Sequence, residues 1–383
     1  MKYKELREKV QNLEKYPGCV KIDRSPLIHK GFPGTFNLSF TEHPWLEEHG
    51  KYADFDHDYV FSTIQSCIRL NDFPLMGSSD SWKYLGVFEM ADLFGMVSLK
   101  DRSNSVDLQR KQTKALFKLF EDLGISKNSI YPSYQAGGKV KEIINGKYDF
   151  DFNIPKDIIS KQVFLEQGVP EENLISDTSR LTFLATNLYK SIPEEKGAIP
   201  ILTPWGYRSE INVNISTKES PKYIDVATIQ RFLWKPISNS GQTTGLDEID
   251  DEVSIAATGL ERLCMVANDL QKVQDVDYIK PFYEVLGKEQ ISCGESLRAL
   301  HRIYSDMKKF KTPSLSRNRK PKIRKLLQNI PRDLTLDKIK DLLQIHSETQ
   351  PWHSELKEGI EPTIERIKVY RNLKTNSQMF SRR

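Results

Sequence analysis

The chain has 383 residues, with 56 lysines and arginines, 52 acidic residues and a formal net charge of +4 at pH 7. A chain of this length can bury a large core and has room for about two domains. The net charge is too small to indicate a partner by itself. The sequence holds no uninterrupted apolar run of about 18 residues, which excludes a membrane-spanning helix of the usual kind.

Cysteine usage and the N-terminus indicate the compartment. The four cysteines, with no Cys-x-x-Cys or His-Cys cluster, stand far apart at positions 19, 67, 264 and 293. This spacing favours reduced thiols over a disulfide framework, and it predicts no zinc site. The first 16 residues are charged and amphipathic and lack the apolar segment of a signal peptide. We therefore expect a soluble, cytoplasmic protein that does not bind membranes.

Hydrophobic periodicity predicts the elements in chain order. Helical patterns occur over residues 1–15, 107–123 and 156–167. Short runs of β-branched and aromatic residues predict strands over residues 59–69, 84–90, 148–153, 209–215 and 222–233.

The connections decide how these strands pair. Segments 70–83 and 216–221 are too short to hold crossover helices, so the strands on either side of each should form antiparallel hairpins. After residue 262 the pattern is helical to the C-terminus. We therefore predict an α+β fold, in which an antiparallel sheet flanked by helices occupies residues 1–270 and a basic, all-α domain follows over residues 271–383.

Two short segments, on strands that are expected to be neighbours, carry residue types suited to binding a nucleotide. Residues 65–69 (QSCIR) end a predicted strand in Arg69, and residues 83–90 (KYLGVFEM) place Phe88 and Glu89 on its partner. An arginine closing one strand, with an acid and an aromatic ring beside it, could grip an α-phosphate and stack an adenine. The ordinary alternatives are a solvated strand-end arginine and a surface salt bridge of the acid.

Two further segments with suitable residues lie later in the chain. Residues 204–211 (PWGYRSEI) form a Pro/Gly turn that delivers Glu210 onto a strand, and residues 259–262 (GLER) place Arg262 at a strand-to-helix junction. The planar fork of a guanidinium meets phosphate oxygens two at a time, which suits a triphosphate. Taken alone, residues 259–262 are more often a helix start with a surface arginine, and a Pro/Gly turn often has no further role.

Taken in order, these segments resemble the catalytic core of the alanyl-tRNA synthetases, a family of class II aminoacyl-tRNA synthetases. The family's Gln-x-Cys-Val-Arg and Arg-His-His-Thr-Phe-Phe-Glu-Met correspond to residues 65–69 and 83–90. Its Gly-Pro-Cys-Gly-Pro-Cys-Ser/Thr-Glu-Ile corresponds to residues 204–211, and its Asp-Thr-Gly-Met-Gly-Leu-Glu-Arg ends in residues 259–262. The resemblance covers roughly residues 20–330 with gaps.

The resemblance implies an AMP-forming ligase that uses ATP and Mg²⁺ to activate an amino acid as an aminoacyl-adenylate. Arg69 would contact the α-phosphate, Arg262 the γ-phosphate and Phe88 the adenine, while Glu89 and Glu210 would serve the nucleotide or its Mg²⁺. Arg69, Glu89 and Arg262 are the implied catalytic residues. The implied ATP-binding residues are Arg69, Lys83, Phe88, Glu89, Glu210, Gly259 and Arg262.

The amino-acid half of the implied site departs from the family. The aspartate that binds the ammonium of alanine aligns with Ile255, although Asp250, Asp251 or Glu252 could replace it if the alignment shifts. Losing the counter-charge of a buried ammonium is costly. We therefore expect an acid other than plain alanine. The residues implied for its pocket are Tyr189, Ala227, Thr228, Gln230 and Ile255.

The chain ends at residue 383, which leaves no room for the family's editing domain with its zinc motif or for its C-terminal oligomerising domain. Without editing, misacylated products would not be cleared in the same chain. The resemblance therefore predicts a minimal, truncated paralogue.

Segment 298–325 holds eleven lysines and arginines against one acid, Asp306. Such a run is either a solvated charged face or a phosphate-contacting surface for the acceptor stem of tRNA. The family's base-reading turn is only partly matched by residues 313–319, because Leu315 stands at the expected Asn position unless Asn318 replaces it. The expected tRNA contacts are Asn318, Arg319, Lys320, Lys322, Arg324 and Lys325.

Three functions fit these observations. The first is ATP-dependent activation of an amino acid or related small carboxylic acid with transfer to a tRNA 3′ end. The second keeps the adenylation but hands the acyl group to a non-tRNA amine or carrier. The third is a non-catalytic RNA-binding paralogue, which would have no need to keep Arg69, Glu89, Glu210 and Arg262 together.

Overall fold

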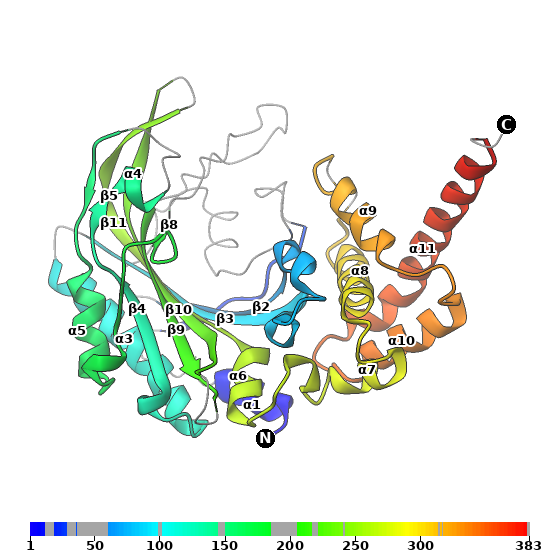
Figure 1. Cartoon of the computed structure of the whole chain (residues 1–383), viewed down its shortest axis with the longest axis horizontal. Helices are drawn as coiled ribbons and strands as arrows, with labels where there is room; N and C mark the ends of the chain where they lie inside the picture. Colours follow the sequence, from blue (N-terminus) through cyan, green and yellow to red (C-terminus); the bar gives the residue numbers. More distant parts are fainter. Residues whose placement is uncertain are drawn as a thin grey trace.

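The computed structural model describes residues 1–11, 19–28, 36, 60–98, 102–144, 150–184, 205–216, 221–239, 242–312, 315 and 317–380 (Figure 1). Within these ranges the fold is α+β, as predicted. A large curved sheet and its helices make up the N-terminal part, and a group of helices beyond β2 and β3 makes up the C-terminal part (Figure 1).

The central sheet has the strand order β1-β2-β3-β11-β10-β9-β4-β7, with β8 paired to β9. Its strands are β1 (Cys19–Lys21), β2 (Val60–Ile68), β3 (Val87–Ser98), β4 (Ile130–Gln135), β7 (Ile175–Asp177), β8 (Phe183–Leu184), β9 (Trp205–Asn214), β10 (Tyr223–Asn239) and β11 (Gln242–Gly259). A separate two-stranded sheet joins β5 (Gly138–Lys139) to β6 (Asn153–Ile154). Of the predicted strand 148–153, only residues 150–153 are described, and β6 begins at the last of them.

Both predicted hairpins are confirmed. Strands β2 and β3 pair antiparallel in a register that joins Ile68 to Val87, and β9 and β10 pair antiparallel in the same way. The sheet is not wholly antiparallel, however, because β1 runs parallel to β2 and β7 runs parallel to β4. Each of these edge strands has three residues and reaches its partner through a long connection, so no tight turn fixes its direction.

Helices α3 (Arg102–Asp122) and α5 (Ile158–Glu166) lie together along one side of the sheet, as Figure 1 shows, close to the predicted ranges. The α3 helix is anchored where Gln112 Nε2 donates to the carbonyls of Leu93 and Ser254, at 3.1 and 3.2 Å. Because buried amides need partners, these bonds fix the helix across β3 and β11. The short helix α4 spans Val140–Ile143.

Two further helices close the end of the sheet. Helix α1 (Tyr3–Gln11) is shorter than the predicted 1–15, whose last four residues lie outside the described ranges. Helix α6 (Leu260–Ala267) follows β11 without a break and packs against α1. The predicted strand-to-helix junction at Gly259 is therefore present. Short 3-10 helices occur at η3 (Leu70–Leu75), η4 (Ser81–Lys83), η5 (Lys127–Ser129), η6 (Glu171–Asn173) and η7 (Val273–Asp275).

The described residues of the C-terminal part form helices and connecting turns and no strands, as predicted. Its helices are α7 (Lys280–Leu286), α8 (Ile291–Lys309), α9 (Lys320–Gln328), α10 (Leu336–Glu348) and α11 (Glu355–Phe380). One hydrophobic core nevertheless runs through both parts, since it includes Leu6, Leu93, Leu263, Leu297 and Leu342. The boundary at residue 270 stays a prediction.

No disulfide joins the four cysteines, all of which lie in described residues. Within the described ranges, none of the helices is both long enough and apolar enough to cross a membrane.

Candidate functional site

A cavity of about 320 Å³ opens on the sheet, where the ends of β2, β3, β9 and β10 meet the start of α6. Six of the seven residues predicted to bind ATP line it: Arg69, Lys83, Phe88, Glu210, Gly259 and Arg262. Three of the five residues predicted for the acid also line it: Ala227, Thr228 and Gln230. The structure thus brings together segments that are far apart in the sequence, and the roles of these residues stay predictions.

Arg69 stands at the mouth of this cavity. Its backbone N–H donates to the carbonyl of Gly86 at 3.1 Å, which is the last bond of the β2–β3 pairing. Its guanidinium lies 5.3 Å from the centre of the Phe88 ring and 3.9 Å from the carboxylate of Asp72. The aromatic ring attracts the cation, and the side chain remains 42% exposed. Arg69 is therefore held in place yet open to an anionic ligand.

Arg262 enters the cavity from the first turn of α6. Its Nε donates to the carbonyl of Lys83 at 3.0 Å, and its Nη1 forms an ion pair with Asp225. The guanidinium also lies 6.0 Å from the centre of the Tyr84 ring. Without a ligand, this arginine thus has a carboxylate of its own as partner, and 15% of its side chain is exposed.

Acids and bases balance along the cavity wall. The basic residues are Arg69, Lys83, Arg208 and Arg262, and the acidic residues are Asp72, Glu210, Asp225 and Glu261. Sequence reasoning missed Arg208, Asp72, Asp225 and Glu261, as well as the apolar Leu85, Met90 and Val226.

Burial raises the pKa of Glu210 above its usual value, although the nearby Arg208, whose Nη2 lies 3.2 Å from the carboxylate, opposes this. The backbone N–H of Glu210 donates to Ser133 Oγ at 3.0 Å, which fixes the strand beneath it. Burial likewise raises the pKa of Asp72, and Arg69 opposes it. Both carboxyls are therefore less readily ionised than free ones.

The carboxylates fit Mg²⁺ only together with phosphate. Oxygen ligands from acids suit this ion, which is commonly held by one or two carboxylates plus the phosphates of a substrate. Among the described residues, no group of three or more Asp, Glu, His or Cys lies close enough to hold a metal ion alone. Glu210 is the predicted ligand that does face the cavity.

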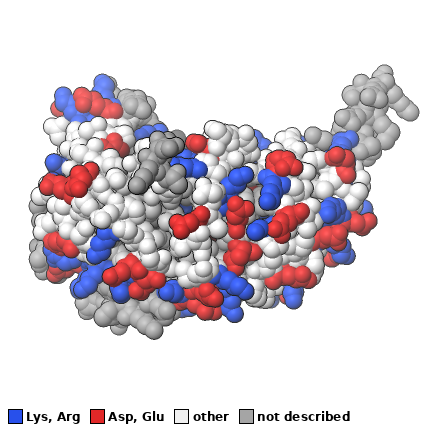
Figure 2. Space-filling model, turned by 60° about the horizontal axis from the view of Figure 1, so that its bottom comes forward, with Lys and Arg blue, Asp and Glu red and all other residues white. Residues whose placement is uncertain are grey.

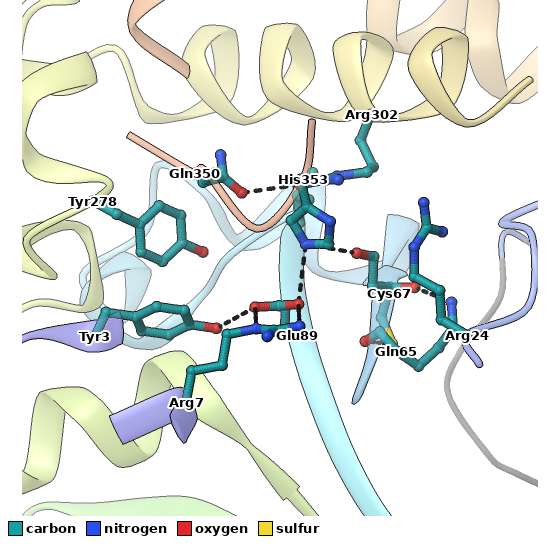
Figure 3. Close-up of polar contacts among 12 residues, drawn as sticks. Tyr3, Arg7, Arg24, Gln65, Cys67, Glu89, Tyr278, Arg302, Gln350 and His353 are labelled. Carbon is teal, nitrogen blue, oxygen red and sulfur yellow. Dashed lines mark hydrogen bonds and ion pairs between the residues drawn. The ribbon is translucent and has the colours of Figure 1, made fainter. Parts of the chain in front are cut away.

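Glu89 does not line the cavity, contrary to the position expected for a nucleotide or Mg²⁺ ligand. Successive residues of a strand point to opposite faces, so Phe88 and Glu89 cannot both face the nucleotide. The Glu89 carboxylate is 4% exposed and accepts bonds from Tyr3 Oη at 2.9 Å, Arg7 Nε at 3.1 Å and His353 Nε2 at 3.0 Å (Figure 3). Burial alone would raise its pKa, but His353 and Arg7 together lower the pKa well below its usual range.

Of the other two residues expected in the acid pocket, the structure describes one, Ile255. Ile255 pairs with Gln230 across β10 and β11, so it shares the cavity face of the sheet, but it is fully buried in an apolar cluster with Phe94 and Phe232 and does not line the cavity. Tyr189 lies outside the described residues.

The basic segment is less basic at the surface than in the sequence. Arg298 and Arg302 are 1% exposed, and they pair with Glu295 and Glu355 inside the helical part. Arg319 is also buried, at 3% exposed. A cation on a helix face that packs against neighbours does not reach solvent, so its position around the helix rather than the charge count decides its exposure.

Exposed lysines of α8 are partly neutralised as well. Lys308 pairs with Glu358 at 3.4 Å, and Lys309 pairs with Glu355 at 3.4 Å. Among the predicted tRNA contacts, Lys322 is half-buried, and the exposed ones are Asn318, Lys320, Arg324 and Lys325. On the face that Figure 2 shows, basic and acidic side chains are interspersed.

No protein-family model matches the chain, and no curated protein matches it. Among solved structures, apo histidyl-tRNA synthetase of S. aureus is similar at 10% identity over 72% of this chain and 68% of its own, with a TM-score of 0.40. Two structures of pyrrolysyl-tRNA synthetase from Desulfitobacterium hafniense are similar at 13% and 14% identity, over 72% and 71% of both chains, with TM-scores of 0.33. Similarities this distant carry no argument about activity or substrate.

Proposed function

We propose that the chain activates a small carboxylic acid with ATP, forming an acyl-adenylate and releasing pyrophosphate. The observation that carries this proposal is the convergence of Arg69 and Arg262, from distant parts of the chain, on one cavity that also holds the Phe88 ring. Two guanidinium groups supply paired donors for phosphate oxygens, and an aromatic face beside them suits a base.

In this proposal the protein acts by positioning and by neutralising charge. Arg69 binds the α-phosphate and Arg262 the γ-phosphate, while Lys83 and Gly259 complete the walls of the nucleotide site. The carboxylate of the substrate attacks the α-phosphorus, the bond to the bridging oxygen breaks, and pyrophosphate leaves with that oxygen. Chemistry of this kind needs stabilised charge rather than a protein nucleophile. Mg²⁺, when bound, supplies further neutralisation, and Glu210 is the residue proposed to hold it.

We propose that the activated acid is an amino acid or related small acid other than alanine. Ala227, Thr228 and Gln230 provide a polar wall at this end of the cavity. The hydroxyl Oγ1 of Thr228 is buried and has no hydrogen-bond partner within the described residues.

For the acceptor, we propose the 3′ end of a tRNA, with Lys320, Arg324 and Lys325 as contacts to the phosphate backbone. These three side chains are exposed and lie in the first two turns of α9. A second candidate is a small amine or a carrier. The buried Arg298 and Arg302 and the paired Lys308 and Lys309 favour it, because they leave a smaller basic surface than the sequence suggests.

The test is ATP–pyrophosphate exchange over a panel of amino acids and related acids. One or a few acids should support exchange, and the Arg262→Ala variant should lose it. A matched control is Arg110→Ala, because Arg110 lies on α3 and pairs on the surface with Glu166. A preference for L-alanine would contradict the altered specificity, and no exchange with any acid would contradict adenylation.

The acceptor is tested by incubating the protein with ATP, the selected acid and total tRNA, followed by mass spectrometry of the products. Acylated tRNA supports the first candidate. A free aminoacyl-adenylate that acylates an amine or carrier, with tRNA unchanged, supports the second.

A further inference from the structure

A buried polar cluster joins the sheet to the helical part on the side of β3 that faces away from the cavity. It consists of Tyr3 and Arg7 from α1, Glu89 from β3 and His353 from the segment between α10 and α11, which Figure 3 shows. Glu261 from α6, which also lines the cavity, completes it through its contacts with Tyr3 and Glu89. Tyr3, Glu89, Glu261 and His353 are each less than 5% exposed. We call these five residues the interdomain cluster.

Within the interdomain cluster, His353 is the contact that comes from the C-terminal helices. Its Nε2 lies 3.0 Å from Glu89 Oε1, and its Nδ1 lies 3.2 Å from Glu355 Oε1, at the start of α11. The ring therefore bridges a carboxylate of the sheet and a carboxylate of the helical part. Removing one member of a buried polar contact is costly, since the partner is left without compensation.

The interdomain cluster is also continuous with the cavity wall. The backbone N–H of Glu89 donates to both carboxylate oxygens of Glu261 at 3.0 Å. On β3 the residues on either side of Glu89 are Phe88 and Met90, both of which line the cavity, and Arg262 directly follows Glu261. A shift of Glu89 would thus move the aromatic wall and the guanidinium of the cavity together.

We infer that His353 is a positioning residue: it holds Glu89, and through it β3 and the first turn of α6, where Phe88 and Arg262 can meet the nucleotide. His353 does not line the cavity, so it acts on the cavity indirectly, through Glu89 and through Ser66 of β2, whose Oγ lies 3.5 Å from its Nε2. The inference makes the helical part a determinant of adenylation and not only of acceptor binding. The kinetic test of this inference rests on the proposed function, because it measures ATP–pyrophosphate exchange.

The kinetic test compares two substitutions of one side chain. The amide of His353→Gln can still donate to a carboxylate, so kcat for ATP–pyrophosphate exchange should stay within about threefold of the unchanged protein. His353→Ala removes the bridge, and misplacing catalytic groups by a fraction of an ångström should lower kcat at least about tenfold. The KM for the acid should change little, because Ala227, Thr228 and Gln230 lie on β10.

The matched control is His346→Ala. His346 is buried at 1% exposed in the same helical part, where it contacts His301 and Phe282. Its removal should lower the melting temperature by an amount similar to His353→Ala but leave kcat unchanged. Equal losses of kcat in the two alanine variants would overturn the inference, because they would reflect loosened helices in general.

A second readout needs no activity. Hydrogen exchange should become faster at the amides of residues 87–91 and 260–262 in His353→Ala and remain unchanged there in His346→Ala. If the unchanged protein activates no acid, the proposed function fails and this comparison still decides the inference. Unaltered exchange in His353→Ala overturns it. Should that variant not fold, His353→Asn takes its place, since its shorter amide stays polar but loses the reach to Glu89.

Discussion

Arg262 shows how much depends on the shape of one cation. Its guanidinium spans the Lys83 carbonyl and the Asp225 carboxylate with separate nitrogens, which an ammonium could not do from the same position. Arg262→Lys keeps the charge but loses the fork, so we expect kcat/KM for ATP to fall by about 10- to 100-fold. The measurement is pyrophosphate exchange at varied ATP, with Arg110→Lys as control. An effect of less than twofold would mean that the charge alone suffices.

Glu261 should give the fold a pH dependence near neutrality. Burial, followed by the charge of Glu89, raises its pKa from 4.5 to about 7. Because the pKa is higher in the folded protein, the protonated Glu261 side chain stabilises the fold fully below pH 4.5. This contribution is lost as the pH rises through 7. The full loss is on the order of 3 kcal/mol for a shift of this size in a buried group.

The Glu261→Gln variant tests this effect. Its free energy of unfolding, measured in urea and compared with that of the unchanged protein, should become more favourable as the pH rises from 5 to 8. The reason is that the amide cannot ionise, whereas the carboxyl of the unchanged protein does. Glu89 does not obscure the comparison, since its lowered pKa affects stability only at more acidic pH. A constant difference between the two proteins across this range would show that Glu261 is ionised throughout.

Nine of the sixteen residues that line the cavity were named from the sequence, and the different position of Glu89 has a simple cause. Arg69, Glu210, Gly259 and Arg262 follow from short motifs whose order along the chain can be read directly. Glu89 was assigned to the same site as Phe88, although the two-residue period of a strand sends neighbours to opposite faces. Asp225 carries no local signal, because it lines the cavity only through the register of β10 against β9.

At the scale of elements, the local sequence pattern predicted the strand pairs that are joined by short connections. The β2–β3 and β9–β10 hairpins and helices α3 and α5 are present as expected, although β3 and β10 extend to Ser98 and Asn239, beyond the expected ends at residues 90 and 233. The parallel edge strand β1 was not expected, since its pairing with β2 bridges a long stretch of sequence. Most of β11 was not expected either, because its polar N-terminal half lacks a strand pattern.

The contact between α8 and α11 should tolerate no enlargement at Gly359. A Cβ at this position would lie 1.8 Å from Ser305 Oγ and 2.9 Å from Ser305 Cα, so the helices would have to separate. We expect Gly359→Ala to lower the free energy of unfolding by about 1–3 kcal/mol, as overpacking does. The control is Gly77→Ala, where a Cβ would meet no atom within 4 Å. Equal stability of the two variants in urea would contradict this packing.

Helix α9 offers the sharpest test of nucleic-acid binding. If Lys320, Arg324 and Lys325 contact phosphates, affinity for tRNA should fall steeply with salt, and each alanine substitution should reduce the slope of log K against log salt by about 0.7–0.9. Filter binding at several salt concentrations measures this slope. Lys340→Ala is the control, because Lys340 lies on α10 and pairs with Glu361 on α11. A flat salt response would remove tRNA as the partner of this helix.

At the scale of the whole molecule, the two predicted domains share one core. The hydrophobic residues of α1, β3, α6, α8 and α10 form a single cluster across residue 270. We therefore expect one cooperative thermal transition by calorimetry, with calorimetric and van't Hoff enthalpies that agree. Two separated transitions, or a stable folded fragment 1–270, would show that the parts fold independently.

Charge counting failed at this scale for a physical reason. Arg298 and Arg302 raised the apparent basicity of segment 298–325. Both arginines are nevertheless buried on α8, where each pairs with a glutamate. Whether a cation reaches solvent depends on which helices surround it, and the acid that pairs with Arg302, Glu355, lies 53 residues further along the chain.

Glu295 gives this arrangement a practical consequence. Its Oε2 accepts the backbone N–H groups of Gly86 and Val87 at 2.7 and 3.2 Å, so a helix of the C-terminal part satisfies the first amides of β3. A chimaera that exchanges everything after residue 270 must bring an equivalent carboxylate, or β3 begins with two dehydrated amides that have no acceptor. Grafting at the apparent domain boundary would therefore damage a wall of the cavity from behind, even though every residue that lines it was kept.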